Sequence, residues 1–211
     1  MGRNRREKAV LRPESSFPDP LTKRCFDFIL ATTGFVVFLP LWIVISVAIF
    51  LEDGRPILFI QKRVGKGGNE FTAYKFRTIY RRYDSEMAQA VAVVSGDHKV
   101  TLVGRALRRT ALNELPQLLN IMRGDMSFVG PRPEPPEFIA AYEKEVPNLG
   151  RIRYQIRPGL TGIAQVFGRH NTNPRNKLRY DVLYMQKRSF WLDIKLMAMS
   201  VRNTICAKWD A

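Results

Sequence analysis

The sequence predicts an α/β protein that is mostly helical, has one β-hairpin, and sits on one leaflet of a membrane through an N-terminal re-entrant helix-break-helix. Three observations lead to this prediction. An uncharged apolar segment near the N-terminus is divided by a proline. Two strand-like runs around a glycine-rich turn follow it. The remaining chain repeats apolar residues at helical spacing between short loops rich in glycine and proline.

The charge of the chain limits its partners. Its 211 residues include 34 Lys and Arg against 19 Asp and Glu, a formal net charge of +15. This excess favours nucleic acid, nucleotide phosphates or an acidic membrane surface. Because the basic residues are spread along the chain and flank the apolar segment, we expect membrane and phosphates and no nucleic acid. The two cysteines, Cys25 and Cys206, have no metal-like spacing, which indicates a reduced compartment.

We expect three parts along the chain: residues 1–24 as a basic N-terminal tail, residues 25–51 as a membrane helix, and residues 52–211 as a domain on the cytosolic face with interfacial helices. In the apolar segment Phe28–Leu51, a straight helix would reach ~36 Å, enough to span a ~30 Å hydrocarbon core. Pro40 lies at its middle and should break it into two arms of ~18 Å, each too short to span.

The flanks of the apolar segment favour a re-entrant path. Basic residues precede it, and Arg55, Lys62 and Arg63 follow it. The positive-inside rule therefore places both ends in the cytoplasm. A spanning helix stays open as an alternative. A signal peptide with a cleavage site near Ser46–Ala48 fits less well, because the apolar run is too long.

The runs 57–60 and 71–76, which follow the apolar segment, predict a hairpin around Gly65–Gly68. A phosphate cradle at this glycine-rich turn is the alternative, but the turn lacks the strand-to-helix context of such a site, so we interpret it as a plain turn. Residues 81–94 predict a surface helix and 103–109 a short basic helix. The loop between them carries His98, to which we assign no catalysis.

The stretch from Arg109 to Pro133 is the most informative part of the sequence. Asn113 is a good helix N-cap, and Pro116 would sit in the first turn. Four apolar residues follow at helical spacing: Leu115, Leu118, Leu119 and Met122. The helix N-terminus would suit a phosphate or a metal-bound anion. Gly124 should end this helix, and the flanking prolines restrict the backbone around Arg132.

Beyond this stretch, residues 137–146 predict an amphipathic helix, and residues 157–166 a loop with a fixed backbone. Residues 178–187 contain Asp181 and Tyr184. The last helix, about 190–206, mixes Trp191 and aliphatic residues with basic ones. This pattern suits an interfacial helix, and plain core packing remains an alternative.

The stretch Thr110–Pro133 closely resembles the signature of the bacterial sugar transferases, the monotopic phosphoglycosyl transferases of the polyprenol-phosphate pathway. That signature reads Leu-Arg-Arg/Lys-Thr-x-Leu-Asp-Glu-Leu-Pro-Gln, then Gly-Asp-Met-Ser-x-Val-Gly-Pro-Arg-Pro. Further matches are Lys23-Arg24-x-x-Asp27, Gln61-x-Arg63-x-Gly65, Lys75-Phe76-Arg77-Thr78 and the loop 157–166. The chain departs from the pattern at Asn113-Glu114, where the family has Asp-Glu, at Leu39-Pro40, where it often has Ser-Pro, and at Phe167, where Asn is common.

The resemblance implies an activity: transfer of a sugar-1-phosphate from a UDP-sugar to a polyprenol phosphate such as undecaprenyl phosphate, with Mg²⁺. In the family, the dyad Asp is thought to attack the sugar-bearing phosphate and expel UMP. The lipid phosphate then displaces the enzyme carboxylate. Such a protein would act at the cytoplasmic face of the bacterial inner membrane, in the first membrane step of glycoconjugate or exopolysaccharide assembly. A homo-oligomer is a further expectation.

The resemblance also assigns residues. Asn113 stands at the nucleophile position, and Glu114 is the candidate Mg²⁺ ligand or base. Five residues are candidates for substrate binding: Arg77, Arg109, Arg132, Arg157 and Asp181. Pro40 marks the membrane break.

Asn113 breaks the family mechanism, because a carboxamide has no anionic oxygen to attack phosphorus. Three explanations stay open: an engineered trapping variant, a natural enzyme with another nucleophile, or a pseudo-enzyme that binds without turnover. A catalytically silent membrane-bound nucleotide-sugar or lipid-binding protein is therefore the competing function. The motifs do not identify the sugar or the pathway.

Overall fold

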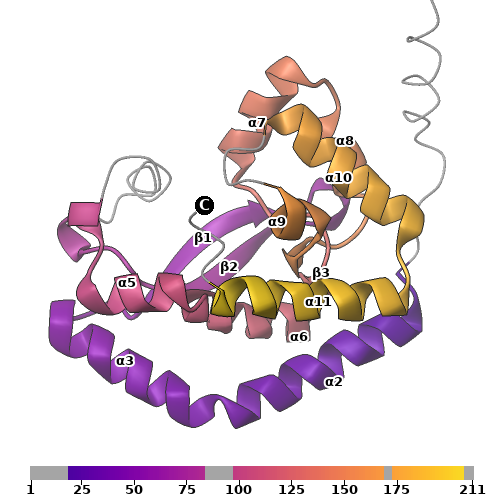
Figure 1. The fold of residues 1–211 in the computed structure, drawn as a ribbon. Coiled ribbons are helices and arrows are strands. Elements are labelled where there is room, and N and C mark those ends of the chain that lie inside the picture. The colour runs from indigo at the N-terminus through magenta and orange to yellow at the C-terminus, as the bar shows by residue number, and fades with distance from the viewer. Residues whose placement is uncertain (1–18, 84–96, 169–172, 207–211) are drawn as a thin grey trace, which may run out of the picture.

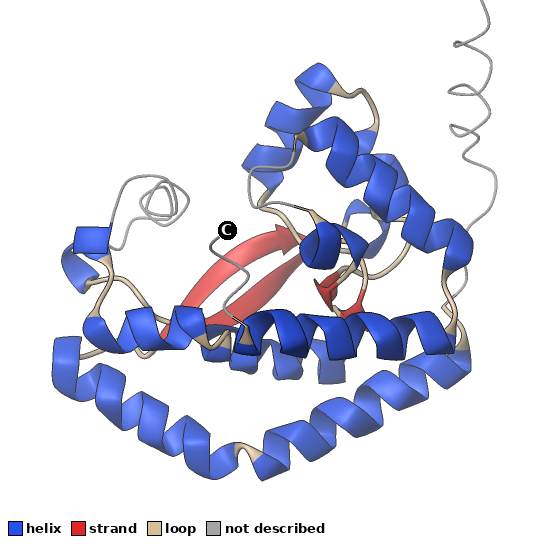
Figure 2. Ribbon diagram, in the orientation of Figure 1, coloured by secondary structure: helices blue, strands red, loops and turns tan. Residues whose placement is uncertain are grey.

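The computed structural model describes residues 19–83, 97–168 and 173–206, which form a mostly helical fold with two small sheets (Figures 1 and 2). Helices α2 (Leu21–Val37) and α3 (Leu39–Asp53) form a bent arm along one side of the other elements (Figure 1). The two axes differ by 60°. In the described residues no single helix is long and apolar enough to cross a membrane, although the bent pair meets that test by length and composition.

The break between the two helices confirms the predicted helix-break-helix in shape, with different bounds. It falls at Phe38, and Pro40 lies in the first turn of α3, where its missing N–H group costs nothing. The arm extends beyond the predicted 25–51 at both ends. Its first turn is held by Arg24, which donates to the carbonyls of Ile121 and Met122, both at 2.6 Å. Because these partners lie about a hundred residues away, the apolar pattern did not contain them.

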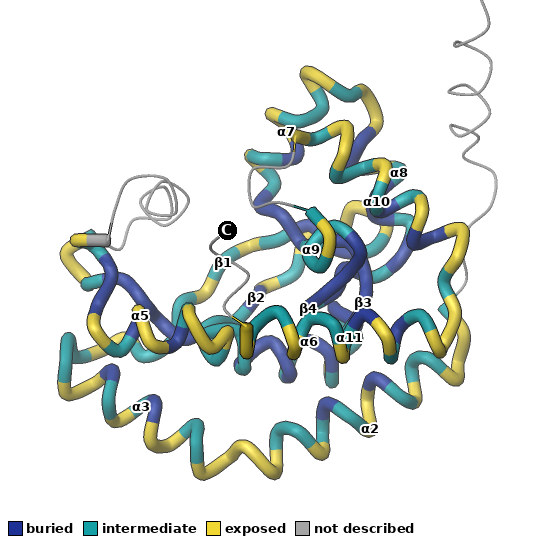
Figure 3. The backbone as a smooth tube through the Cα atoms, viewed as in Figure 1, coloured by how far each residue is buried: buried dark blue, intermediate teal, exposed yellow. Residues whose placement is uncertain are grey.

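One side of the bent arm packs on the domain and the other side is exposed (Figure 3). Ala31, Ile45 and Ile49 are buried. The exposed side carries large apolar residues along its length: Leu21, Phe28, Ile29, Val36, Val37, Phe38, Leu39, Ile43, Val44, Val47, Phe50 and Leu51. An exposed apolar surface of this extent is typical of an interaction site.

The predicted hairpin is confirmed. Strands β1 (Leu58–Val64) and β2 (Glu70–Phe76) pair antiparallel with Gln61 opposite Ala73, and a 3-10 turn, η1 (Lys66–Gly68), connects them. Phe76 at the end of β2 packs into a core cluster with residues of α3 and α5. The hairpin is therefore fixed between the bent arm and the rest of the domain.

The segment after the hairpin is only partly described. A 3-10 turn, η2 (Arg81–Tyr83), stands at the start of the predicted surface helix 81–94, and the rest of that prediction lies outside the described residues. A second turn, η3 (Asp97–Lys99), precedes helix α5 (Leu102–Arg109), which confirms the predicted basic helix. The side chain of Thr101 caps α5 by accepting a hydrogen bond from the Gly104 amide.

A second sheet was not predicted. Strand β3 (Ser127–Val129) pairs in parallel with β4 (Gly159–Thr161), so the loop after Arg157 lies against the loop that carries Arg132. A side chain at Gly159 would place its Cβ only 2.0 Å from the backbone nitrogen of Gly130. This close approach explains why glycine occupies the position.

Among the described residues, the helices after β3 are α7 (Pro136–Glu145), α8 (Leu149–Arg153), α9 (Ile163–Phe167), α10 (Pro174–Lys187) and α11 (Phe190–Ile205). Helix α11 contacts both strands of the second sheet. Leu196 of α11 is buried in the main core cluster. Trp191 and Ile205 of the same helix remain exposed. One face of α11 thus packs in the core. The exposed residues on the helix are compatible with an interfacial role, which stays a prediction.

Candidate functional site

The central stretch forms two short helices instead of one capped α-helix. Residues Leu112–Gln117 form a 3-10 helix, η4, and Leu118–Arg123 form α6. The prediction that Asn113 is the N-cap is wrong, because the helix is preceded by Ala111, two residues earlier, which has a left-handed φ of 56°. Gly124, with φ of 93°, ends α6 as predicted. Helix α6 has only six residues, so its dipole is weaker than that of the longer helix predicted to start at Asn113.

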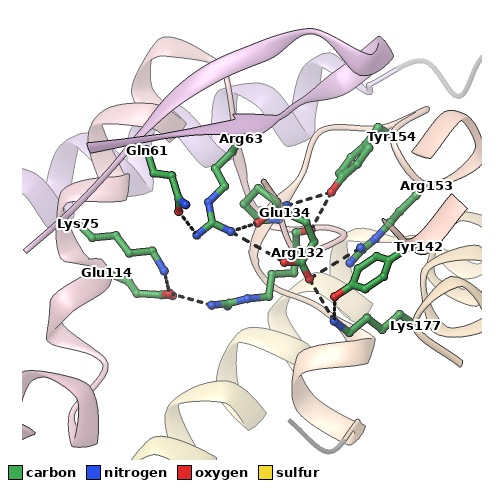
Figure 4. Close-up of polar contacts among 11 residues, drawn as sticks. Gln61, Arg63, Lys75, Glu114, Arg132, Glu134, Tyr142, Arg153, Tyr154 and Lys177 are labelled. Atoms are coloured by element: carbon green, nitrogen blue, oxygen red, sulfur yellow. Dashed lines mark hydrogen bonds and ion pairs between the residues drawn. The ribbon is translucent and has the colours of Figure 1, made fainter. Parts of the chain in front are cut away.

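Next to η4 lies a small hollow between the hairpin, the Pro-Arg-Pro loop and the second sheet. Its lining residues are Arg63, Ala73, Lys75, Glu114, Gln117, Arg132, Pro133, Gly159 and Leu160. The hairpin register explains the first three. Gln61 pairs with Ala73, and Arg63 and Lys75 are each two residues further along their own strands, so all four share one face. Figure 4 shows how the charged members meet.

Glu114 is the acidic group of this hollow, and two cations approach it. Its Oε1 lies 2.5 Å from Lys75 Nζ and 3.4 Å from Arg132 Nη2. Burial alone would raise the pKa of Glu114, but Lys75, Arg132 and Arg63 outweigh it and lower the pKa to about 2. Burial lowers the pKa of Lys75 to about 8, although Glu114 opposes the change. Arg132 keeps 41% of its side chain exposed, so it is the accessible cation of the three.

Arg63 links the hollow to a buried charge network. Its guanidinium donates to Gln61 Oε1 at 2.5 Å and to the Pro133 carbonyl at 2.9 Å. One of its nitrogens also lies 3.9 Å from Glu134 Oε2. Burial would raise the pKa of Glu134, but the surrounding cations, Arg153 first, lower it instead. Arg63 thus connects strand β1 with both residues that follow Arg132.

Glu134 is the centre of that network (Figure 4). Its Oε1 lies 3.3 Å from Lys177 Nζ and 4.0 Å from Arg153 Nη1. Its backbone amide donates to the Tyr154 hydroxyl at 3.0 Å, and that hydroxyl donates to the Arg132 carbonyl at 3.2 Å. The backbone on both sides of Pro133 is therefore held by side-chain contacts as well as by proline geometry.

Asp181 belongs to the network and not to the wall of the hollow. It is buried and accepts from Arg153 Nε at 2.6 Å. Burial raises its pKa to about 6, although the arginine opposes the change. The structure thus connects Asp181 to the Pro-Arg-Pro loop through Arg153 and Glu134, while its direct contact with a substrate stays a prediction.

Arg77, Arg109 and Asn113 do not line the hollow that holds Glu114 and Arg132. Arg77 is buried, forms an ion pair with Asp53, and donates to the Gly54 carbonyl at 2.8 Å, so it clamps the end of α3. Arg109 is exposed at the end of α5. Asn113 precedes Glu114 in η4 and is half-buried, but it is not among the lining residues of the hollow.

Arg157 lines a different cavity. It donates to the Gly124 carbonyl at 2.7 Å and pairs with Asp19 at 2.5 Å. That cavity also includes Arg24 and Asp27 in the first part of the bent arm. Desolvation raises the pKa of Asp27, and Lys23 opposes the change. Arg157 therefore connects Asp19, just before α2, with Gly124 at the end of α6, and it does not line the hollow of Glu114.

The metal prediction rests on Glu114 alone. Within the three described ranges, no group of three or more His, Cys, Asp and Glu side chains could hold a metal ion. Mg²⁺ commonly binds through one or two carboxylates together with substrate phosphates and water, so a single carboxylate meets its minimum requirement. The donor set is compatible with Mg²⁺ only when a diphosphate supplies further oxygens.

Arg63, Lys75 and Gln117 line the hollow but were not predicted as site residues. The first two stood inside recognised motifs, but their roles depend on strand alternation and register, which place both on the η4 side of the hairpin. Gln117 stood three residues after Glu114, and in a 3-10 helix such residues lie on the same side. The 3-10 geometry was the missing signal.

Comparisons with known proteins show the family of the chain. The model of a family described as bacterial sugar transferase matches residues 19–207. The chain is 42% identical over 205 residues to a UDP-glucose:undecaprenyl-phosphate glucose-1-phosphate transferase of Caulobacter vibrioides, covering 93% of this chain and 75% of the relative. It is 36% identical to a UDP-N-acetylgalactosamine-undecaprenyl-phosphate N-acetylgalactosaminephosphotransferase of Aeromonas hydrophila, covering 90% of this chain but only 46% of that protein. It is also 32% identical to the exopolysaccharide production protein ExoY of Rhizobium meliloti, covering 86% and 84%.

Proposed function

The chain belongs to the bacterial sugar transferase family, and we propose that its site serves the transfer of a sugar-1-phosphate from a UDP-sugar to undecaprenyl phosphate. The relatives with this activity in their names use UDP-glucose or UDP-N-acetylgalactosamine. In this chain, Asn113 replaces the family's nucleophilic Asp. The proposal is therefore that donor binding is intact and that the covalent step through residue 113 is closed.

The charge balance of the hollow carries the proposal. Arg63, Lys75 and Arg132 bring three positive charges to a space in which Glu114 brings one negative charge. A diphosphate would balance this excess. The partly exposed Arg132 offers a planar pair of N–H donors that suits phosphate oxygens.

Glu114 is the residue that would hold Mg²⁺ together with the donor's phosphates. The ion would neutralise charge on the diphosphate. In the free protein, Lys75 occupies the Glu114 carboxylate, so a phosphate that draws Lys75 toward itself would release one carboxylate oxygen.

The bent arm supports the membrane part of the proposal. Its exposed side is apolar along both helices, and its bend would return the chain to the face from which it entered. Undecaprenyl phosphate would approach the hollow from that side, at the cytoplasmic face of the bacterial inner membrane.

Asn113 also supports a second candidate function, a catalytically silent nucleotide-sugar-binding protein at the membrane. Its amide cannot form an acyl phosphate, because it has no carboxylate oxygen to attack phosphorus. Binding does not require that oxygen, since the cations lie on other residues. The two candidates share one binding site and differ in turnover.

Measuring UMP release from UDP-glucose and UDP-N-acetylgalactosamine, with undecaprenyl phosphate and Mg²⁺, tests the proposal. The chain as given should bind donor without releasing UMP. The Asn113→Asp variant should release UMP and show a phosphosugar adduct by intact mass. Turnover of the chain at a rate comparable with its variant would exclude residue 113 as the nucleophile position. Failure of both forms to bind a UDP-sugar would overturn the proposed function.

A further inference from the structure

Gln117 has a buried hydrogen-bond donor without a partner in the wall of the hollow. Its side chain is 2% exposed, and its Nε2 makes no hydrogen bond in the part of the chain that the structure describes. Other side chains with such an atom do not line the hollow: Thr32, Trp42, Arg77, Arg153, Thr161 and Gln165. Gln117 therefore combines an unused donor with a place beside the charged residues.

A neighbouring amide shows the usual arrangement. Asn120 is fully buried, and its Nδ2 donates to the Thr72 carbonyl at 2.7 Å while its Oδ1 accepts from the Tyr74 amide at 3.2 Å. It fastens α6 to strand β2. A buried donor without such partners costs free energy, because it has lost water and gained nothing in exchange. The Gln117 amide nitrogen is such a buried, unpaired donor.

The surroundings of Gln117 determine which ligand could satisfy it. The neighbouring cations, Arg63, Lys75 and Arg132, have only donors to offer. Glu114 lies three residues earlier in η4, on the same side of the 3-10 helix, yet its carboxylate makes no hydrogen bond with Gln117 Nε2 in the described structure. The missing partner is therefore an acceptor brought by the ligand. In a hollow with excess positive charge, an anionic oxygen suits best.

We propose that the Gln117 carboxamide donates a hydrogen bond to a phosphate oxygen of the bound nucleoside diphosphate. This inference rests on the proposed function and adds a residue to it. Glu114 and Gln117 then form one recognition edge of η4, since the first would hold the metal ion and the second would bind the phosphate. Glu114 and Gln117 lie on one side of η4 because it is a 3-10 helix, in which residues three apart are aligned.

The test compares UDP affinity with thermal stability in the full chain. In calorimetric titration with UDP and Mg²⁺, the UDP affinity of Gln117→Met should be lower than that of the parent by roughly tenfold or more, because a hydrogen bond to a charged group is lost. The melting temperature of Gln117→Met should be equal to or above that of the parent, since methionine removes an unpaired donor at similar volume. A structural glutamine would behave in the opposite way.

A second variant covers the case in which Gln117→Met fails to fold. Gln117→Glu keeps the shape but places a carboxylate beside the phosphate, and it should weaken UDP binding more than methionine does. Asn120→Asp is the matched control. It should lower the melting temperature, because the Thr72 carbonyl loses its donor, and leave the UDP affinity of the folded protein unchanged.

The outcomes distinguish the role of Gln117 from the proposed function. UDP binding by the parent with equal affinity in Gln117→Met or in Gln117→Glu would overturn the role of Gln117 and leave the proposed function standing. A lower melting temperature with unchanged affinity would make Gln117 a structural residue. No UDP binding by the parent would overturn the proposed function, and the role of Gln117 with it.

Discussion

Lys75 and Glu114 form a largely buried ion pair, 2.5 Å between Nζ and Oε1, across the interface of strand β2 and helix η4. About a fifth of each side chain is exposed, at 19% and 18%. The pair joins two motifs that lie 39 residues apart in the chain. It keeps the proposed metal ligand ionised and occupied until a ligand competes for Lys75.

This pair predicts a particular response to acid. The pKa of Glu114 is about 2 in the folded protein against a usual 4.5, so its ionised form stabilises the fold above pH 4.5, and that stability is lost as the pH falls toward 2. The difference in free energy of unfolding between the parent and Glu114→Gln should therefore shrink between pH 4.5 and pH 2. Chemical denaturation followed by circular dichroism measures it.

Glu70→Gln is the control for the acid experiment, because Glu70 makes an exposed ion pair with Lys62 at 3.4 Å. Its difference from the parent should stay small at every pH, as exposed pairs contribute little. A Glu114→Gln difference that does not change with pH would contradict the prediction.

Glu134→Gln should destabilise the fold and weaken nucleotide binding together. The substitution removes a buried negative charge among Arg63, Arg153 and Lys177 at nearly constant volume. Leaving buried charges unpaired costs about 3 kcal/mol or more. Thermal melting and UDP titration are the measurements. UDP affinity should fall because the loop that carries Arg132 loses its support.

The exposed Glu137 of α7 provides the charge-matched control for Glu134. Glu137→Gln should change neither the melting temperature nor the UDP affinity. Normal UDP affinity in a destabilised Glu134→Gln protein would show that the network supports the fold alone.

Arg77 should act on stability without affecting the nucleotide. Its guanidinium binds Asp53 and the Gly54 carbonyl through two different nitrogens. Arg77→Lys cannot make both contacts, so it should cost about 1–3 kcal/mol of unfolding free energy. Arg81→Lys, at an exposed side chain nearby, should cost almost nothing. UDP titration of both variants should match the parent. Weaker UDP binding by folded Arg77→Lys would support the prediction that Arg77 binds substrate.

The two native cysteines can test the re-entrant path. Cys25 at the start of α2 and Cys206 at the end of α11 are both exposed. In variants that keep one cysteine each, a membrane-impermeant maleimide should label neither thiol in intact cells and both after permeabilisation. Labelling of Cys25 from outside, with Cys206 protected, would indicate a spanning helix instead.

Local features of the fold could be predicted from the sequence because they depend on neighbouring residues. Proline at position 40 favoured a break, Gly124 favoured a helix end, and the glycine-rich turn favoured the hairpin, and all three are confirmed. The resemblance likewise identified Glu114 and Arg132, which the structure brings to one hollow. These signals lie within a few residues of the features they determine.

Tertiary structure decided the rest, because it depends on contacts between distant segments. Pairing of β3 with β4 joins residues about thirty positions apart, and neither short strand has a pattern of its own. Arg77 and Lys75 lie two residues apart in the same motif, yet one clamps α3 and the other meets Glu114. Residue types and spacing determined the chemistry available to this chain. The packing of β2 against η4 decided which of these side chains lie close enough to act in one site.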